Sequence, residues 1–178
     1  MGVPIKALFA AFIFLFFALF SSLALAQDVP EDFEVVFTSS PALVSQDIEI
    51  ESLKINANGE VVLSPKVWYA GQIPDYTREE LPEMTLQLNP EALAGILKAI
   101  NENEFFTLDA NYNDPNIMDG DWAELTITAG GQTRTVRTRN IKVNAFDRIT
   151  IAINGQLPVE RRLKYNAING ADYEEVER

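Results

Sequence analysis

The chain has 178 residues, 14 of them basic and 26 acidic, and it contains neither cysteine nor histidine. The lack of both residue types excludes disulfides, Ser-His and Cys-His nucleophile pairs, and thiolate or imidazole metal sites. The formal net charge of −12 also argues against nucleic acid as a partner, because binding to phosphates requires a basic surface.

Residues 1–26 are predicted to be a secretory signal peptide. Lys6 precedes an apolar run from Ala7 to Phe20, and Ala24-Leu25-Ala26 supplies a small-residue cleavage site. The alternative is a retained N-terminal anchor, because the apolar segment approaches the roughly 20 residues that span a bilayer. We favour cleavage, which predicts an exported, periplasmic or extracellular protein that starts at Gln27 and has no stable membrane insertion.

The remaining chain is long enough for one domain, which we place at 27–169, followed by an acidic, flexible tail at 170–178. A domain of this size buries roughly two thirds of its unfolded surface and needs no disulfide. Its charge is uneven, since 28–124 contain 20 acidic and four basic residues, whereas 134–164 contain eight basic and two acidic ones. Either the two parts neutralise each other across the fold, which we favour, or the basic part binds an anion.

Two strands are predicted at the start of the domain. Phe33, Val35 and Phe37 alternate with polar residues, as in a strand with one buried face. A second strand over 48–55 changes its apolar parity near Glu51, which predicts a β-bulge at that point.

The turn at 56–59 determines the register of the next hairpin. A three-residue loop with Gly59 left-handed places Ile55 opposite Val61 and Leu53 opposite Leu63. A loop of Asn58 and Gly59 alone would place Leu53 opposite Ser64. We expect the first register, because it matches apolar residues with apolar residues.

The first helix has a clear start signal after a short strand at 84–88. Asn89-Pro90-Glu91 combines an N-cap side chain, a proline at the first helical position and a carboxylate in the first turn. The next apolar residues form one stripe at helical spacing: Leu93, Ile96, Leu97 and Ile100. Before this strand, the acidic, proline-containing segment 73–83 is predicted to be a surface loop, with Trp68 and Tyr69 completing the core.

A second hairpin and a second helix follow. The segment 123–129 alternates, Gly130-Gly131 turns the chain, and 132–138 returns it. With Val136 inward, Thr135, Arg137 and Arg139 are expected to share the solvent face. Asn144 is predicted to cap a helix that carries Phe146, Ile149, Ile153 and Leu157 on its apolar side. The order of elements predicts a two-layer α+β domain, with both helices on one face of an antiparallel sheet of hairpins.

Several short motifs occur in a fixed order along the chain. They are Asn58-Gly-Glu-Val61, Phe105-Phe-Thr-Leu-Asp-Ala-Asn-Tyr112, Asp119-Gly120 and Gly130-Gly131. Together they resemble an uncharacterised bacterial exported domain, one of the domains of unknown function, over 33–157. The resemblance implies export and this fold but no chemistry. That family often has a cysteine pair ahead of the first hairpin, and 39–46 contain none, so no role tied to those cysteines carries over.

The segment Asp109–Asp121 is a candidate calcium site. Asp109, Asn111 and Asn113 reproduce the first three ligand positions of a calcium loop, and Asp119 and Asp121 are further oxygen ligands nearby. The sixth position should be glycine and the twelfth glutamate, but this chain has Asp114 and Gly120. The alternative, which we favour, is an ordered connection, because Asp and Asn are common in loops.

For function, we expect a non-catalytic exported binding or interaction domain that contacts an unknown protein or an anionic ligand. The candidate contact residues are Arg134, Arg137, Arg139, Arg161 and Arg162. The alternative is a hydrolase that acts on glycans with carboxylates alone, such as Asp119 with Asp121 or Glu79 with Glu80. The sequence has no phosphate-binding loop and no dinucleotide fingerprint, and calcium is the one cofactor considered.

Overall fold

A computed structural model of the chain describes residues 28–40, 51–72, 75–117, 122–163 and 175–176. For 67–79 and 175–176 only the main chain is described. The predicted signal peptide therefore lies outside the described residues, as do residues 48–50 of the predicted strand at 48–55. No helix among the described residues is both long enough and apolar enough to cross a membrane.

The described elements alternate strands with two helices and two short 3-10 turns. In chain order they are β1 (Glu34–Ser40), β2 (Glu51–Asn56), β3 (Glu60–Leu63), β4 (Lys66–Gln72), β5 (Asp75–Leu81), β6 (Met84–Gln87), α2 (Pro90–Glu102), η1 (Phe105–Thr107), β7 (Asn111–Asn113), β8 (Trp122–Ala129), β9 (Gln132–Arg139), β10 (Lys142–Val143), α3 (Asn144–Asn154), η2 (Val159–Arg161) and β11 (Glu175–Val176).

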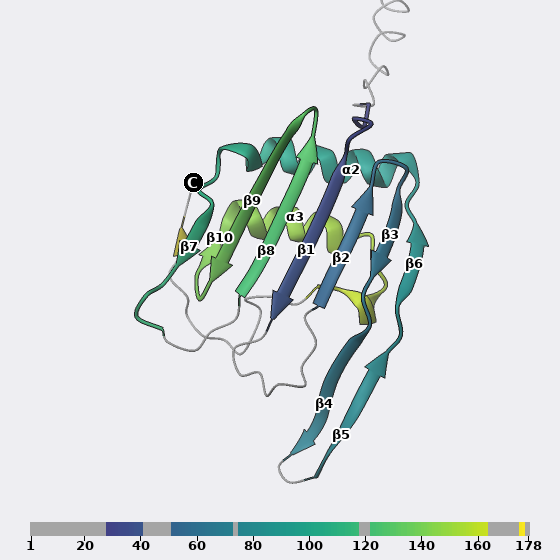
Figure 1. Cartoon of the computed structure of the whole chain (residues 1–178), viewed down its shortest axis with the longest axis vertical. Helices are drawn as coiled ribbons and strands as arrows, with labels where there is room; N and C mark the ends of the chain where they lie inside the picture. Colours follow the sequence, from purple (N-terminus) through teal and green to yellow (C-terminus); the bar gives the residue numbers. More distant parts are fainter. Residues whose placement is uncertain (1–27, 41–50, 73–74, 118–121, 164–174, 177–178) are drawn as a thin grey trace, which may run out of the picture.

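Seven strands form one sheet in the order β6-β3-β2-β1-β8-β9-β7. Its pairs are antiparallel except for β7, which runs parallel to β9. Figure 1 shows α2 and α3 side by side behind this sheet. The predicted two-layer α+β fold is confirmed, because both helices cover the same face, and within the described ranges no helix lies on the other face.

The predicted register of the first hairpin is confirmed. Leu53 pairs with Leu63 and Ile55 with Val61, and Gly59 has a left-handed φ of 84°. A Cβ atom at Gly59 would lie 2.7 Å from the main-chain oxygen of Leu88. Both the backbone conformation and the close approach therefore require glycine at this position.

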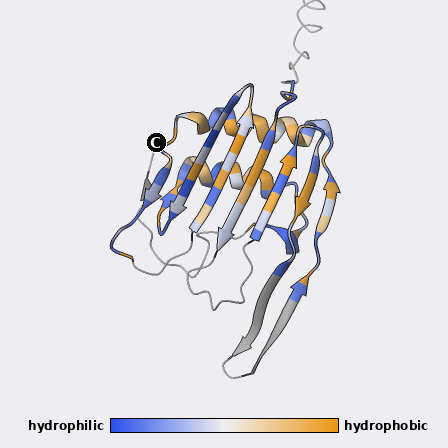
Figure 2. Ribbon diagram, viewed as in Figure 1, coloured by the Kyte–Doolittle hydropathy of each residue, from blue (hydrophilic) through white to orange (hydrophobic). Residues whose placement is uncertain are grey.

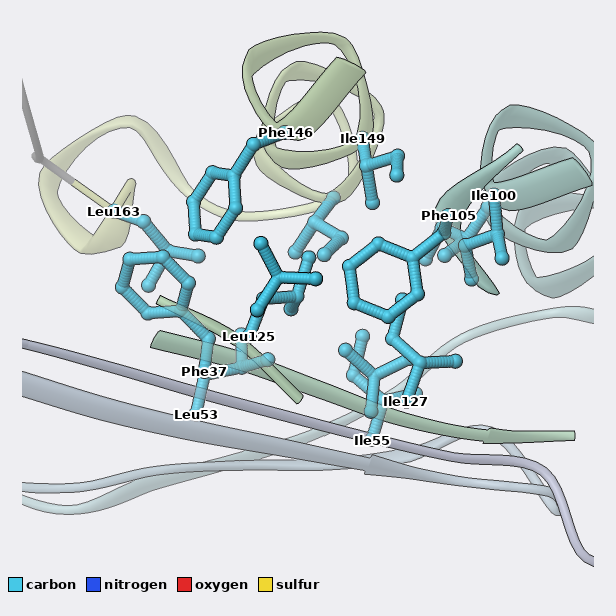
Figure 3. Packing of buried hydrophobic residues seen from close by; sticks show 14 of the residues in the cluster. Phe37, Leu53, Ile55, Ile100, Phe105, Leu125, Ile127, Phe146, Ile149 and Leu163 are labelled. Carbon is cyan, nitrogen blue, oxygen red and sulfur yellow. The ribbon is translucent and has the colours of Figure 1, made fainter. Parts of the chain in front are cut away.

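The core fills the space between the sheet and the two helices. Figure 3 shows Phe146 and Ile149 of α3 directed toward Leu125, Phe37 and their neighbours on the sheet. The rings of Phe37 and Phe146 have centroids 6.4 Å apart. The predicted apolar residues Leu93, Ile96, Leu97 and Ile100 of α2 are all buried, as are Phe105 and Leu108 after the helix, whereas Phe106 is partly buried.

The two helices begin in different ways. At α2, the Ala92 N–H donates to Asn89 Oδ1 at 2.8 Å, so the predicted cap is confirmed. At α3, the predicted cap is wrong by one residue, because Val143 occupies the capping position and Asn144 is already helical. Val143 remains extended, as it belongs to the parallel pair of β10 with β11. This pair also shows that the segment predicted as a tail contributes a short strand at Glu175–Val176.

The predicted surface loop at 73–83 is wrong. Asp75–Leu81 forms β5, which pairs with β4 in an unbroken antiparallel register from Lys66 opposite Leu81 to Gln72 opposite Asp75. We name this pair the ribbon; it extends beyond the edge of the main sheet (Figure 1). The sequence of the ribbon lacks the apolar alternation of a core strand. Such alternation arises where one face of a strand is buried, and the ribbon lies outside the two-layer core.

Candidate functional site

The open face of the sheet carries the predicted arginines of β9. Thr135, Arg137 and Arg139 are exposed on this face, whereas Val136 and Thr138 between them are buried. The predicted shared solvent face is therefore confirmed. In Figure 2, β9 is coloured mainly as hydrophilic, in contrast to the apolar residues along β1 and β8.

Trp122 of β8 lies within this group of arginines. The guanidinium carbon of Arg137 lies 4.6 Å from the centroid of the Trp122 ring, which is a cation–π contact. Arg139 is the direct cross-strand neighbour of Trp122, and Glu124 is the neighbour of Arg137. The indole therefore holds one guanidinium in place and lies beside the second.

The edge strand β7 borders the two arginines on their other side. Asn111 pairs with Arg137 and Asn113 pairs with Arg139 in a parallel register. The Arg137 N–H donates to the Ala110 carbonyl at 2.9 Å, which fixes the position of this edge. Because alternate strand residues share a face, the exposed Asn111 and Asn113 lie beside the arginines. We call Trp122, Arg137, Arg139, Asn111 and Asn113 the arginine face.

The remainder of the predicted calcium segment is an ordered connection as far as the structure describes it. The Asp109 N–H donates to the Tyr112 hydroxyl at 3.0 Å. Asp114 Oδ1 accepts the Asn116 N–H at 2.9 Å, a turn made by an aspartate side chain. Among the described residues, no three carboxylates gather as they would around a metal. Asp119 and Asp121 lie outside those residues.

The structure separates the five arginines that the sequence grouped together. Arg134 belongs to the opposite parity of β9, and its guanidinium donates to the Leu108 carbonyl. Arg161 is 4% exposed and also donates to main-chain carbonyls. Arg162 is exposed after η2. Arg134 and Arg161 thus hold the fold together, and Arg137 with Arg139 remain as neighbours on the open face.

The amides of the Gly130-Gly131 turn bind a carboxylate of the chain itself. The Gly130 N–H donates to Asp32 Oδ1 at 2.8 Å, and the Gly131 N–H donates to Oδ2 at 2.6 Å. These bonds, first that of Gly131 and then that of Gly130, hold the pKa of Asp32 below its ordinary value of 3.8. Both glycines have positive φ, which directs their amides to one point. The sequence showed the glycine turn but not its carboxylate partner, since almost a hundred residues separate the two.

An open groove of about 870 Å³ lies at the start of α2. Its wall is mainly apolar and includes Val29, Ala57, Leu88 and Leu93. The amide of Gln87 lies on the rim and donates to the Asn58 carbonyl at 2.6 Å, which closes the turn beside the groove. Asp28 and Glu91 also line the groove, so its charged groups are acidic, whereas those of the arginine face are basic.

No protein-family model and no curated protein matches this chain. The resemblance to exported domains of unknown function therefore stays a prediction.

Proposed function

We propose that this protein is an exported, non-catalytic binding domain whose arginine face holds an anionic partner. The observation that carries the proposal is the contact of Arg137 with Trp122 on the open face of the sheet. Such stacking restricts the guanidinium before a ligand arrives, so less conformational entropy is lost when its donors bind a carboxylate or phosphate.

The chemistry around this contact favours an anion. Arg137 and Arg139 are two residues apart on one strand, which places their side chains on the same face. Each guanidinium offers a planar set of donors that matches a carboxylate. Asn111 and Asn113 add amide groups at the edge, and Glu124 is the one carboxylate paired directly with Arg137 across the strands.

Three lysines outside β9 form ion pairs with acidic residues. Lys54 forms an ion pair with Glu34, Lys66 with Glu51, and Lys98 with Glu102. These pairs lie on β1, β2, β4 and α2, away from β9. These three lysines are thus neutralised within the acidic half of the chain, whereas Arg137 contacts an aromatic ring.

The proposal is tested with fluorescein-labelled poly-L-glutamate as the anionic probe and with the chain from Gln27 to Arg178. Replacing Arg137 and Arg139 together by glutamine should weaken binding at least about tenfold, because one charge-assisted hydrogen bond contributes about 1.5 kcal/mol. The matched control replaces Lys98 and Arg148, two exposed basic residues of the helices, by glutamine.

The control removes the same charge from the helix layer. Its affinity for the probe should stay within about twofold of the wild-type value, as expected when only the net charge changes. Equal losses in the two variants would show binding through net charge alone and would contradict the proposal. Failure of the wild-type chain to bind the probe at low salt would contradict it as well.

A further inference from the structure

β6 is an edge strand of the main sheet. It pairs with β3 on one side, and in the part of the chain that the structure describes no strand pairs with its outer side (Figure 1). The Leu88 N–H donates to the Gly59 carbonyl at 2.8 Å, so Leu88 directs its main chain toward β3. Main-chain groups of an antiparallel strand alternate between its two sides. The N–H and C=O groups of Thr85 and Gln87 therefore point outward, where a further strand could pair with them.

β6 lacks the features that usually protect an edge strand. Natural edges carry charged residues, prolines or bulges that prevent further pairing. The sequence of β6, Met84-Thr-Leu-Gln87, contains neither a charge nor a proline. At the other edge of the sheet, β7 has three residues and is followed by Asp114 and Pro115. β6 is therefore the edge that favours addition of another strand.

The apolar side chains of β6 are incompletely covered. Met84 and Leu86 pair with the buried Leu63 and Val61 of β3, so they face the helix layer. Both are only partly buried, because they lie at the edge of the core. A strand added beside β6 would cover the surface that remains exposed.

The sequence of β6 is complementary to itself in one antiparallel register. With Leu86 opposite Leu86 of a second copy, Thr85 of each copy lies opposite Gln87 of the other. Thr85 and Gln87 are the residues whose main-chain groups point outward, so this register continues the hydrogen-bond ladder of the sheet. The two Leu86 side chains then meet at a position without main-chain hydrogen bonds, where side chains lie closest.

The flanking residues favour this register over its neighbours. It places Met84 opposite Leu88 and Glu83 opposite Asn89, so apolar residues meet and no two carboxylates face each other. That matters in a chain with a formal net charge of −12. A shift by two residues in either direction keeps the ladder but places a proline opposite an apolar residue, which is Pro82 opposite Leu88 or Pro90 opposite Met84.

Exposed apolar surfaces at the two ends of β6 would also come together. Val159 of η2 is 70% exposed, and η2 is tied to the start of β6 because Arg161 donates to the Pro82 carbonyl at 2.9 Å. The mainly apolar groove lies at the other end, where Leu88 lines it. Antiparallel pairing reverses the second strand. It therefore brings Val159 of one copy to the same end of the interface as the groove of the other.

We propose that this protein forms a two-fold dimer in which β6 pairs with β6 of a second copy and joins the two seven-stranded sheets into one. The same residues contribute from both copies, so the contact closes at the dimer. One strand pair is a small interface of the weak, transient class. The inference goes beyond the proposed function, because β3, β2, β1 and β8 separate β6 from the arginine face.

Disulfide trapping tests the register. The chain has no cysteine, so one introduced thiol can link only to a second copy. Paired Leu86 residues would have Cα atoms about 4.5 Å apart, within the range of about 4.4 to 6.8 Å that a disulfide allows. In a glutathione redox buffer, Leu86→Cys in the chain from Gln27 to Arg178 should form a covalent dimer. The matched control is Ile151→Cys, which replaces an apolar residue of α3 that is 68% exposed.

Leu86→Cys should link at least about tenfold faster than Ile151→Cys, because pairing raises the effective concentration of the thiols. Adding Thr85→Pro removes an outward N–H but no bond to β3, so it should reduce the linking rate to that of the control. Urea unfolding checks that the proline variant is folded. Replacing Arg137 and Arg139 by glutamine, at the other edge, should leave the rate unchanged.

A cysteine pair tests the same register without proline. Thr85→Cys mixed with Gln87→Cys should link mainly to each other, because the two positions are opposite across the interface. Intact mass distinguishes the mixed dimer from the two homodimers. Equal yields of all linked species, or a Leu86→Cys rate no higher than that of Ile151→Cys, would overturn the proposed pairing. A folded Thr85→Pro variant that links as fast as its parent would do so as well.

Sedimentation velocity of the wild type at about 10 to 500 µM measures the dimer without a cross-link. Association should be stronger at about 0.5 M salt than at about 0.02 M, because salt screens the repulsion between two acidic copies. A wild type that stays monomeric over this range would overturn the inference. Association that salt abolishes would also overturn it, since the contact would then depend on charges that β6 lacks.

Discussion

The guanidinium of Arg161 donates to the main-chain oxygen of Ser64 at 2.6 Å across 97 residues of sequence. The same side chain also binds Pro82 and is 4% exposed. It therefore joins the 3-10 turn after α3 to both strands at the base of the ribbon. The C-terminal part of the domain thus helps to hold the ribbon, which lies in the first half of the domain.

Replacing Arg161 by methionine should lower the free energy of unfolding by about 2 kcal/mol, because the buried Arg161 side chain loses both of its charge-assisted bonds to main-chain carbonyls. Urea unfolding at neutral pH measures the change, and limited proteolysis should detect faster cleavage within 66–81. The adjacent Arg162 is exposed, so its replacement by methionine should change stability by less than about 0.5 kcal/mol. Equal effects of the two substitutions would contradict the anchoring role of Arg161.

Asp32 should make stability depend on pH. Its pKa is lowered in the folded state by the Gly131 and Gly130 amides. A lowered folded pKa gives stability that is present above the ordinary value of 3.8 and is lost as pH falls through the folded pKa. The wild type should therefore be more stable than the Asp32→Asn variant at pH 7, and the difference should shrink in acid.

Thermal unfolding of both proteins between about pH 7 and pH 2.5 measures the difference across this window. Glu31 is adjacent and exposed, and its replacement by glutamine provides a control for the loss of one charge. A stability difference between the wild type and Asp32→Asn that is independent of pH would rule out this linkage.

The elements that follow from local sequence rules, such as a periodic apolar stripe, a cap or a turn, were predictable from the sequence. The apolar stripe of α2, the Asn89 cap and the hairpin around Gly130-Gly131 all follow from local rules, and the structure confirms them. Gly59 could be assigned its left-handed conformation because one loop length matched apolar pairs across the hairpin.

The predictions that failed concern features that depend on contacts between distant segments. β5 lacks an apolar period because it lies outside the core. The separate roles of the five arginines follow from strand parity and from burial against Leu108, Pro82 and Ser64, which no local pattern encodes. Likewise, Trp122 joins the arginine face through the register of β8 with β9. The composition of the basic segment left an anion site as one of two alternatives, and only the tertiary structure shows that Arg137 and Arg139 lie together on one face of the sheet.

Two glycines should respond to alanine with opposite signs. Gly59 has φ of 84°, and a Cβ there would lie 2.7 Å from the Leu88 carbonyl oxygen, so Gly59→Ala should cost about 2 kcal/mol or more of stability. Gly95 lies on the exposed side of α2 with open space around it, so Gly95→Ala should stabilise by about 0.5 to 1 kcal/mol. Urea unfolding compares the two, and a Gly59→Ala variant as stable as the wild type would contradict the assigned turn geometry.

Calcium should leave the melting temperature unchanged. Asn111 and Asn113 lie in the extended strand β7, where side chains two positions apart are separated by roughly 6.6 Å along the strand. A calcium loop instead wraps its oxygens around the ion at about 2.4 Å. Differential scanning calorimetry with millimolar calcium and then with a chelator tests this expectation. A rise in melting temperature that replacing Asn111 and Asn113 by alanine removes would reinstate the calcium site.

The contact between Arg137 and Trp122 should be measurable as an energetic coupling in ligand binding. Trp122→Leu keeps an apolar side chain on β8 but removes the ring under the guanidinium. It should weaken the binding of poly-L-glutamate by about two- to fivefold, because exposed cation–π contacts contribute about 0.5 to 1 kcal/mol.

The double-mutant cycle of Trp122→Leu with Arg137→Gln isolates this coupling. Trp122→Leu should have little effect once Arg137 is absent, since the ring then has no guanidinium to order. A parallel cycle with Arg139→Gln is the control, because Arg139 is a register neighbour of Trp122 but is not the arginine stacked on its ring. Additive effects of Trp122 and Arg137 would show that the indole contributes surface area alone and that the arginine face is not ordered before its ligand binds.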